Sequence, residues 1–227
     1  MKYIFELPRV SLPVKDREQQ FPVNRVFCVG RNYAEHAKEM GADPDREAPF
    51  FFSKPASAVF VPQGEVPYPP RTGDLHHEAE LVVALHRGGH SLTVAAARDC
   101  VFGYSVGIDF TRRDLQAEAK KQGRPWDTAK GFDASGPMSE LVAVEDCGWL
   151  DRGAITLSLN GEQKQQGDLS DMIWKVEEII AELSTYYTLQ AGDIIFTGTP
   201  AGVGAVNRGD VVDAAIAGAG QLTFRMV

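Results

Sequence analysis

The sequence predicts an α+β fold with a β-rich core. Apolar residues fall mostly in short runs of strand length, such as Val26–Val29 and Ile155–Leu159. Turn sequences separate these runs, and Asn160-Gly161 is of the kind that closes a β-hairpin. Helical periodicity is confined to three or four segments, of which Met172–Tyr187 is the longest. Many short strands with a few helices are typical of the α+β class.

The predicted elements follow one another in a clear order. Residues 1–24, with their prolines, form a short strand or hairpin in an N-terminal annex, and residues 25–227 form the main domain. Strands are expected at Val26–Val29, Phe50–Phe52, Ala58–Val61, Glu78–Leu85, Val101–Asp109, Ile155–Leu159, Ile194–Thr197 and in two final short runs. Helices are expected at Tyr33–Met40, Val94–Asp99 and Met172–Tyr187. A further helix is expected to begin at Thr111, as N-cap with Asp114 three residues later, and to run to about Gln122.

Composition and charge exclude several classes of protein. The chain has 31 acidic and 23 basic residues, a net charge of −8, which argues against a nucleic-acid partner because phosphate binding draws on Lys and Arg. The longest apolar run, Leu81–Leu85, is too short for a membrane span, and Glu6, Pro8 and Arg9 interrupt any signal peptide. The three cysteines form no C-x-x-C pair and predict reduced thiols in a cytoplasmic protein.

Three acidic residues are candidate metal ligands. Glu78 and Glu80 lie two positions apart in a predicted strand, so their side chains share one face. Two such carboxylates repel each other unless they are solvated, protonated or bridged by a cation. A solvated strand edge is the alternative, although the run Leu81–Leu85 indicates a buried strand. Asp109 ends a second such strand, where a turn or cap role is the alternative. Together they suit Mg²⁺ or Mn²⁺, with Ca²⁺ as a further candidate.

A histidine and a glutamate form a candidate general base. His36 and Glu39 lie at positions i and i+3 of the expected helix Tyr33–Met40, so their side chains can touch. A carboxylate beside an imidazole is the usual arrangement for orienting a general base. An exposed surface pair is the alternative, and spacing alone favours it.

A basic segment follows Asp109. Arg113 and Gln116 share one face of the expected helix, and residues 112–130 carry six basic and three acidic side chains. Such a local positive field suits a small anionic substrate. A solvated, salt-bridged helix is the alternative. The residues for which we expect this solvated role are Lys120, Lys121 and Glu118.

Two further motifs give weaker indications. His76 and His77 could recruit Zn²⁺, but neighbours on a strand point to opposite faces, so at most one could join the carboxylates. Residues 197–204 form a glycine-rich loop that would let the backbone approach a ligand. No helix pattern follows this loop and it lacks a Gly-Lys-Ser/Thr sequence, so it is not a P-loop or a dinucleotide motif.

An ordered set of short segments carries a family resemblance. The set comprises Gly30-Arg31-Asn32-Tyr33 with His36 and Glu39, Lys54-Pro55, His77-Glu78-Ala79-Glu80-Leu81, Gly107-Ile108-Asp109, Lys130-Gly131-Phe132-Asp133, Asn160-Gly161, and Thr197-Gly198-Thr199-Pro200-Ala201-Gly202-Val203-Gly204. In this order the segments resemble the fumarylacetoacetate hydrolase (FAH) superfamily, and in particular its acylpyruvase and fumarylpyruvate hydrolase branch. The similarity runs from about Arg25 to the C-terminus and leaves the annex outside it.

The resemblance implies a fold and a set of roles. The fold would be an FAH-type mixed β-sandwich roll with a few short helices, usually in a homodimer. By analogy, Glu78, Glu80 and Asp109 would bind Mg²⁺ or Mn²⁺. The residues matching catalytic positions are His36, Glu39 and Lys130, the first two as a water-activating pair. The residues matching substrate contacts are Arg31, Arg113, Gln116, Lys130 and Thr199.

The activity implied is hydrolysis of a C–C bond in a 3-acylpyruvate, such as fumarylpyruvate to fumarate and pyruvate in aromatic (gentisate) catabolism. Glu39 would orient His36, and His36 would take a proton from water. Lys130 and Gln116 would stabilise the oxyanion that forms when the water attacks. The metal would stabilise the pyruvate enolate that leaves. Alternatives within the family are decarboxylation of oxaloacetate and isomerisation of a dienoic hydroxy acid. An alternative from another class is a non-catalytic, metal-stabilised binding protein, which would not need His36, Glu39 and Lys130 together.

Overall fold

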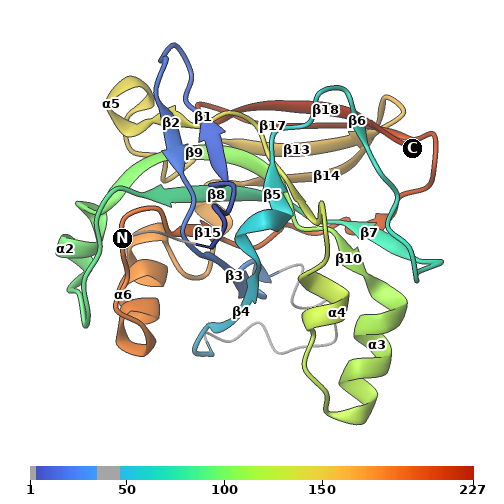
Figure 1. The fold of residues 1–227 in the computed structure, drawn as a ribbon, viewed down its shortest axis with the longest axis horizontal. Helices are drawn as coiled ribbons and strands as arrows, with labels where there is room; N and C mark the ends of the chain where they lie inside the picture. The colour runs from blue at the N-terminus through green and yellow to red at the C-terminus, as the bar shows by residue number, and fades with distance from the viewer. Residues whose placement is uncertain (1–3, 35–46) are drawn as a thin grey trace.

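The computed structural model describes residues 4–34 and 47–227. Two large β-sheets form the body of the protein, with short helices around them, which confirms the predicted β-rich α+β fold (Figure 1). The six-stranded sheet has the order β12 (Val142–Ala143), β9 (Val101–Ile108), β8 (Ala79–Leu85), β15 (Ile194–Phe196), β3 (Val26–Gly30) and β4 (Phe50–Lys54). The five-stranded sheet has the order β14 (Glu162–Asp168), β13 (Ala154–Leu159), β17 (Val211–Ile216), β18 (Gly220–Met226) and β6 (Glu65–Val66).

The two sheets share one hydrophobic core. Strand β8 lies between β9 and β15 and is buried along its whole length, as its unbroken apolar sequence predicts. Strands β13 and β17 instead alternate between buried and less buried residues, so one face of their sheet packs inward. The core joins side chains of both sheets, among them Leu81, Val106, Ile155, Val212 and Phe224.

Three small sheets complete the strand pairing. They are β10 (Thr111–Arg112) with β7 (Leu75–His77) and β16 (Gly204–Ala205), β11 (Gly136–Pro137) with β5 (Val59–Phe60), and β1 (Ser11–Pro13) with β2 (Gln20–Pro22). The β1–β2 hairpin falls within residues 1–24, for which we expect an N-terminal annex. Its Leu12 and Phe21 side chains are buried in a second hydrophobic cluster, together with Met138 and Leu141.

The helices gather at two ends of the sheets. Among the described residues they are α2 (Val94–Arg98), α3 (Arg113–Gln122), α4 (Asp127–Lys130), α5 (Val144–Cys147) and α6 (Val176–Tyr186), with short 3₁₀ turns η1 (Ala56–Ala58) and η2 (Leu169–Asp171). Helices α3 and α4 lie together beside β7 and β10, whereas α2 packs against α6 (Figure 1). In the part of the chain that the structure describes, no helix combines the length and apolarity that a membrane span requires.

Some local expectations differ from the structure. The predicted Thr111 cap is wrong, because Arg112 occupies the N-cap of α3 and the Thr111 hydroxyl instead donates to Glu78 Oε1 at 3.1 Å. The expected helix 172–187 begins only at Val176, since η2 precedes it. The hairpin predicted at Asn160-Gly161 is present, but no bounds were predicted for its second strand, β14, because the sequence of β14 is almost wholly polar. The expected helix Tyr33–Met40 lies largely outside the described residues.

Candidate active site

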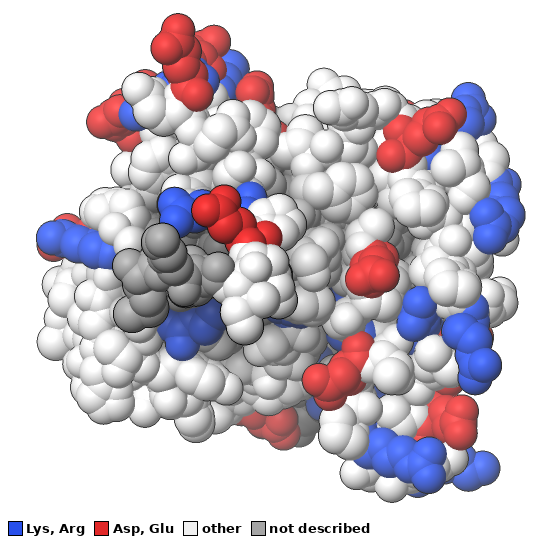
Figure 2. All heavy atoms as spheres, in the orientation of Figure 1, with Lys and Arg blue, Asp and Glu red and all other residues white. Residues whose placement is uncertain are grey.

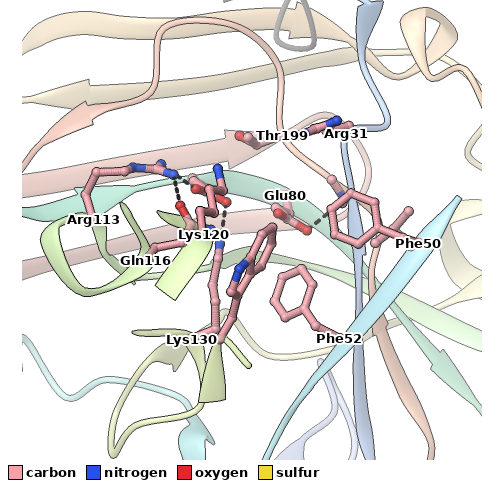
Figure 3. A pocket seen from close by; sticks show the side chains of 14 residues that line it. Arg31, Phe50, Phe52, Glu80, Arg113, Gln116, Lys120, Lys130 and Thr199 are labelled. Atoms are coloured by element: carbon pink, nitrogen blue, oxygen red, sulfur yellow. Dashed lines mark hydrogen bonds and ion pairs between the residues drawn. The ribbon is translucent and has the colours of Figure 1, made fainter. Parts of the chain in front are cut away.

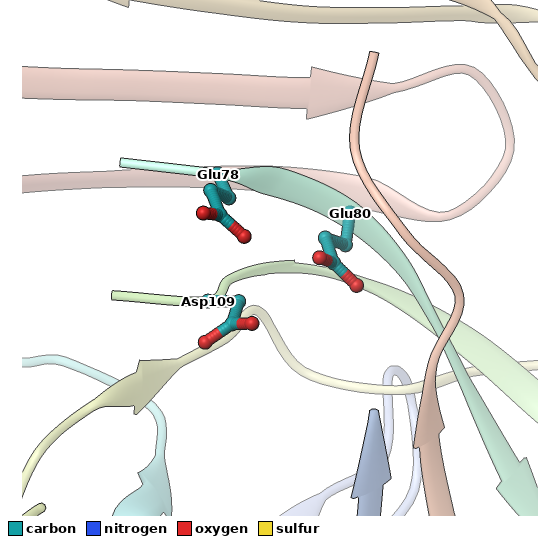
Figure 4. Close-up of side chains that lie close together, drawn as sticks. All are labelled: Glu78, Glu80 and Asp109. Carbon is teal, nitrogen blue, oxygen red and sulfur yellow. The ribbon is translucent and has the colours of Figure 1, made fainter. Parts of the chain in front are cut away.

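Three buried carboxylates converge between strands of the six-stranded sheet. Glu78, Glu80 and Asp109 each offer an oxygen, and these oxygens lie within 4.8 Å of one another (Figure 4). The exposed fractions of the three residues are 7%, 2% and 0%. The structure therefore brings together the three acids that the sequence singles out as candidate metal ligands.

A break in a two-stranded ribbon places these side chains. Strand β8 pairs with β9 in the six-stranded sheet, whereas the preceding β7 pairs with β10 in the small sheet. Glu78 occupies the step from β7 to β8, and Asp109 follows β9 on the paired strand. Their backbones are joined across the break, since Asp109 N–H donates to the carbonyl of Glu78 at 2.8 Å. The break therefore places the carboxylates of Glu78 and Asp109, which come from paired strands, next to each other.

Two buried lysines balance the negative charge. Lys130 Nζ, at the end of α4, donates to Glu78 Oε2 at 2.8 Å and to Asp109 Oδ2 at 2.7 Å. Burial lowers the pKa of Lys130, but Asp109 and Glu78 outweigh it and raise that pKa above its ordinary value. Lys54 Nζ lies 2.8 Å from Asp109 Oδ1 and also donates to the carbonyl of Lys130. We did not assign Lys54 to the site from sequence, since its position at the end of an aromatic strand does not reveal its partner.

Arg113 and Gln116 extend the site along α3. Arg113 donates through Nη2 to Glu78 Oε1 at 2.7 Å and through Nη1 to Gln116 Oε1 at 2.6 Å. Because Oε1 is the acceptor of this bond, the amide nitrogen of Gln116 is left as its donor group. The predicted face of Arg113 and Gln116 therefore lies against the carboxylates.

The donor set fits a divalent cation. Asp109 Oδ1 is buried and accepts no hydrogen bond from any described residue, although the Lys54 ammonium is close. Glu80 accepts a hydrogen bond from Gly198 N–H at 2.7 Å, yet burial, with Asp109 and Glu78 nearby, raises its pKa well above the ordinary value. Clustered carboxylates, of which Glu80 has no ion-pair partner among the described residues, are a setting that a hard cation relieves. An all-oxygen set suits Mg²⁺, Mn²⁺ or Ca²⁺.

The neighbouring histidines stay out of the carboxylate cluster. His76 lies 2.9 Å from Asp74, and burial together with Arg113 lowers its pKa. His77 is buried and contacts Gln165 Oε1 at 3.0 Å through Nδ1. The same glutamine donates to the hydroxyl of Thr199 at 2.7 Å. The side chain of Gln165 therefore links His77 to the glycine-rich loop.

A pocket of about 420 Å³, including its open mouth, leads to the carboxylates (Figure 3). The residues that line it are Val29, Gly30, Arg31, Phe50, Phe52, Glu78, Glu80, Arg113, Gln116, Lys120, Trp126, Lys130, Gly198 and Thr199. All five predicted substrate-contact residues are among them. Asp109 lies behind Lys130 and is not part of the lining.

The sequence missed two parts of this lining. Lys120 was expected on a solvated helix face, but it borders the pocket, with Nζ 5.1 Å from the ring centre of Trp126. The aromatic residues Phe50, Phe52 and Trp126 were not expected at the site, because aromatic side chains in short strands and loops are more often core residues. On the face in Figure 2, Lys and Arg side chains gather at the lower right, where α3 and α4 lie, with acidic side chains among them.

Two predicted catalytic residues fall outside the described part of the chain. His36 and Glu39 belong to residues 35–46, so their pairing stays a prediction. Arg31, just before this segment, does border the pocket and has a left-handed backbone with φ of 60°. A non-glycine residue in this region costs on the order of 1 kcal/mol or more, which makes Arg31 notable at a functional site.

The chain belongs to the fumarylacetoacetate hydrolase family. The family model described as "Fumarylacetoacetate (FAA) hydrolase C-terminal" matches residues 25–227. This is the family that the ordered sequence motifs resemble, and its members include enzymes.

Individual relatives carry two kinds of name. The chain is 42% identical to a fumarylpyruvate hydrolase of a Ralstonia species, over 82% of this chain and 97% of the relative. It is 44% identical to the oxaloacetate tautomerase YcgM of Escherichia coli, over 84% of this chain and 87% of the relative. The crystal structure of fumarylpyruvate hydrolase from Pseudomonas aeruginosa with Mn²⁺ and pyruvate is similar, with a TM-score of 0.97 and 47% identity over 100% of this chain and 99% of that one.

Proposed function

We propose that the protein is a metal-dependent hydrolase that cleaves a C–C bond in 3-acylpyruvates, with fumarylpyruvate as substrate and fumarate and pyruvate as products. The observation that carries this proposal is one pocket in which Glu78 and Glu80 adjoin Lys130, Arg113 and Gln116. The similarity to a fumarylpyruvate hydrolase that holds Mn²⁺ and pyruvate supports it. The same proposal includes a cytoplasmic homodimer acting in aromatic catabolism.

The carboxylates would hold the metal. Glu78, Glu80 and Asp109 are the ligands we assign to Mg²⁺ or Mn²⁺, in line with the fit of the donor set. A bound divalent cation would act as a Lewis acid that stabilises the enolate of the departing pyruvate. Lys54 and Lys130 would orient Asp109, since both ammonium groups approach it within hydrogen-bonding distance.

The remaining side chains would bind and activate the substrate. Lys130 and the Gln116 amide would donate to the oxygen that gains charge when water attacks the distal carbonyl, where each donor is typically worth about 10²–10³ in rate. Arg113, at the start of α3, and Thr199, in the loop after β15, would hold the carboxylate and keto oxygens. Outside the described residues, Glu39 would orient His36, and His36 would remove a proton from the attacking water.

A second candidate is tautomerisation of oxaloacetate. The name of the Escherichia coli relative favours it, at 44% identity. Tautomerisation needs a cation to stabilise an enolate and a group that moves a proton, but no activated water. The pocket with Glu78, Glu80 and Lys130 could serve that reaction without a His36–Glu39 pair.

One substrate panel tests these proposals. Metal-stripped, Mg²⁺-loaded and Mn²⁺-loaded protein would be incubated with fumarylpyruvate, acetylpyruvate and oxaloacetate, with products followed by NMR. Metal-dependent release of pyruvate from an acylpyruvate is the expected result. Faster exchange between the keto and enol forms of oxaloacetate, with no acylpyruvate cleavage, would establish the tautomerase instead. Release of CO₂ would indicate a decarboxylase, and binding without turnover a non-catalytic protein.

A further inference from the structure

The cations of the pocket fall into two groups. Arg113 and Lys130 lie at its inner end and are paired with Glu78 or Asp109. Lys120 and Arg31 also line the pocket, but both are exposed, and neither makes an ion pair with any described residue. The inner cations are thus each paired with a carboxylate of the site, whereas the outer cations have no ion-pair partner in the described part of the chain.

An aromatic wall connects the two groups. The ring of Trp126 packs against Phe50 at 5.6 Å and against Phe52 at 5.9 Å between ring centres. Lys130 Nζ lies 5.1 Å from the ring centre of Phe52, and Lys120 Nζ lies 5.1 Å from that of Trp126. The wall therefore runs from the inner lysine to the outer lysine, and its rings offer flat apolar surface in between (Figure 3).

The proposed substrate has chemical groups in the same order as the inner cations, the aromatic wall and the outer cations of the pocket. A fumarylpyruvate molecule carries a keto acid at one end, a flat unsaturated chain in the middle and a second carboxylate at the other end. With the keto acid beside Glu78 and Glu80, the flat chain would lie along the aromatic wall. The second carboxylate would then approach the outer cations. An uncharged acyl group, as in acetylpyruvate, would leave those cations without a partner.

Resting on the proposed function, we propose that Lys120, assisted by Arg31, binds the carboxylate at the far end of the acyl chain and thereby selects anionic acylpyruvates over uncharged ones. Lys120 is then a specificity-determining residue rather than part of a solvated helix face. The electrostatic surroundings agree: burial, Arg113 and Arg31 all lower the pKa of Lys120, as expected for a cation in a positive region. An incoming carboxylate would relieve that repulsion.

The test compares two adjacent lysines on α3. Lys120→Met removes the outer charge and keeps an unbranched side chain, whereas Lys121→Met removes an exposed charge that does not line the pocket. For Mn²⁺-loaded Lys120→Met, we expect kcat/KM for fumarylpyruvate to fall about 10- to 100-fold, mainly through KM, as for the loss of a charge-assisted hydrogen bond. For acetylpyruvate it should stay within about twofold. Lys121→Met should change neither value, and Lys120→Arg should restore most of the fumarylpyruvate activity.

The outcomes separate this inference from the proposed function. An equal loss for both substrates, or no loss for either, would overturn the role of Lys120. If the wild-type protein cleaves neither substrate, the proposed hydrolase is wrong, and calorimetry still tests selectivity by binding. Metal-loaded wild-type protein should then bind fumarylpyruvate at least tenfold more tightly than acetylpyruvate, and Lys120→Met should remove that preference. An unchanged preference in the variant would refute the inference.

Discussion

Lys54 Nζ lies 2.8 Å from Asp109 Oδ1, and both side chains are buried from solvent. The lysine comes from the end of β4 and the aspartate from the end of β9, two strands that are not neighbours in the sheet. Lys54 also donates to the backbone carbonyls of Lys130 and Phe110. One ammonium group therefore holds a candidate metal ligand and the backbone of the candidate catalytic lysine.

Lys54→Met should destabilise the metal-free protein strongly. Removing one partner of a buried ion pair typically costs about 3–5 kcal/mol when the other charge is left unpaired. We expect a loss towards the lower end of that range, because Lys130 still donates to Asp109. Saturating Mn²⁺ should reduce this loss, because the metal supplies positive charge to Asp109. Urea denaturation with and without Mn²⁺ measures both effects, with Lys121→Met as an exposed control. An equal loss in both conditions would show that Lys54 does not act through the metal site.

Glu78→Ala and Asp109→Ala should each abolish metal binding and activity together. Both residues offer an oxygen to the same buried position, where Glu80 is the third carboxylate of the cluster, and we expect Glu80 alone with one remaining acid not to hold the cation. Mn²⁺ binding by calorimetry and turnover of fumarylpyruvate are the two measurements. Glu118→Ala, which removes an exposed acid from α3, is the control and should leave both unchanged. Full activity in either variant with no bound Mn²⁺ would refute the ligand assignment.

The stability of the metal-free protein should decrease with rising pH because of Glu80. Burial, together with Asp109 and Glu78, raises the pKa of Glu80, so the folded state holds a proton that the unfolded state releases above about pH 4.3. The favourable contribution is present below that pH and is lost as pH rises towards the folded-state pKa. Stabilisation by Mn²⁺ should increase over the same window, because binding displaces this proton. Denaturation of the wild type and Glu80→Gln from pH 5 to 8 should show a steeper decline for the metal-free wild type.

His36→Ala should separate hydrolysis from metal binding. If His36 activates water, the variant should keep its affinity for Mn²⁺ and for substrate but lose about 10²–10⁴ in the rate of acylpyruvate cleavage. Tautomerisation of oxaloacetate, which needs no attacking water, should be affected little. Steady-state kinetics on both substrates test this, and near wild-type cleavage would show that another group activates the water.

Gly198→Ala should weaken both the fold and the metal site. Gly198 has a φ of +98°, and an added Cβ would lie 2.7 Å from Asn32 Cβ. The Asn32 side chain cannot move freely, because its amide donates to the carbonyls of Thr197 and Trp174. We expect a loss of about 1–3 kcal/mol in the free energy of unfolding and weaker Mn²⁺ binding, since Gly198 N–H supports Glu80. Gly209→Ala is a useful control, because its φ of +88° is similar but its Cβ would meet nothing within 4 Å.

The sequence was most informative where a pattern is local. The unbroken apolar run of β8, the Asn160-Gly161 hairpin and the stop of α3 at Gly123 are each visible within a few residues, and the structure has all three. The acidic cluster was also predictable in outline, because Glu78 and Glu80 are close in sequence and Asp109 ends a similar strand.

Long-range partners could not be read in the same way. Lys54 is 55 residues from Asp109, and nothing near it in sequence indicates the buried ion pair. The sequence around Lys120 is typical of a solvated helix face, and its position beside Trp126 in the pocket lining depends on the tertiary fold. The polar strand β14 forms because β13 supplies its pairing partner, so tertiary pairing decides its structure and propensity does not.

The ribbon break has an evolutionary consequence. The carboxylates that it places are buried in the sheet core, where almost any substitution disturbs packing or charge balance. Lys120 and Arg31 lie on the exposed side of the same pocket, where side chains can change at little structural cost. If Lys120 selects the acyl group, the enolate chemistry and the acyl-group preference depend on different side chains of one pocket, and a substitution at the exposed side can alter the preference without disturbing the buried carboxylates.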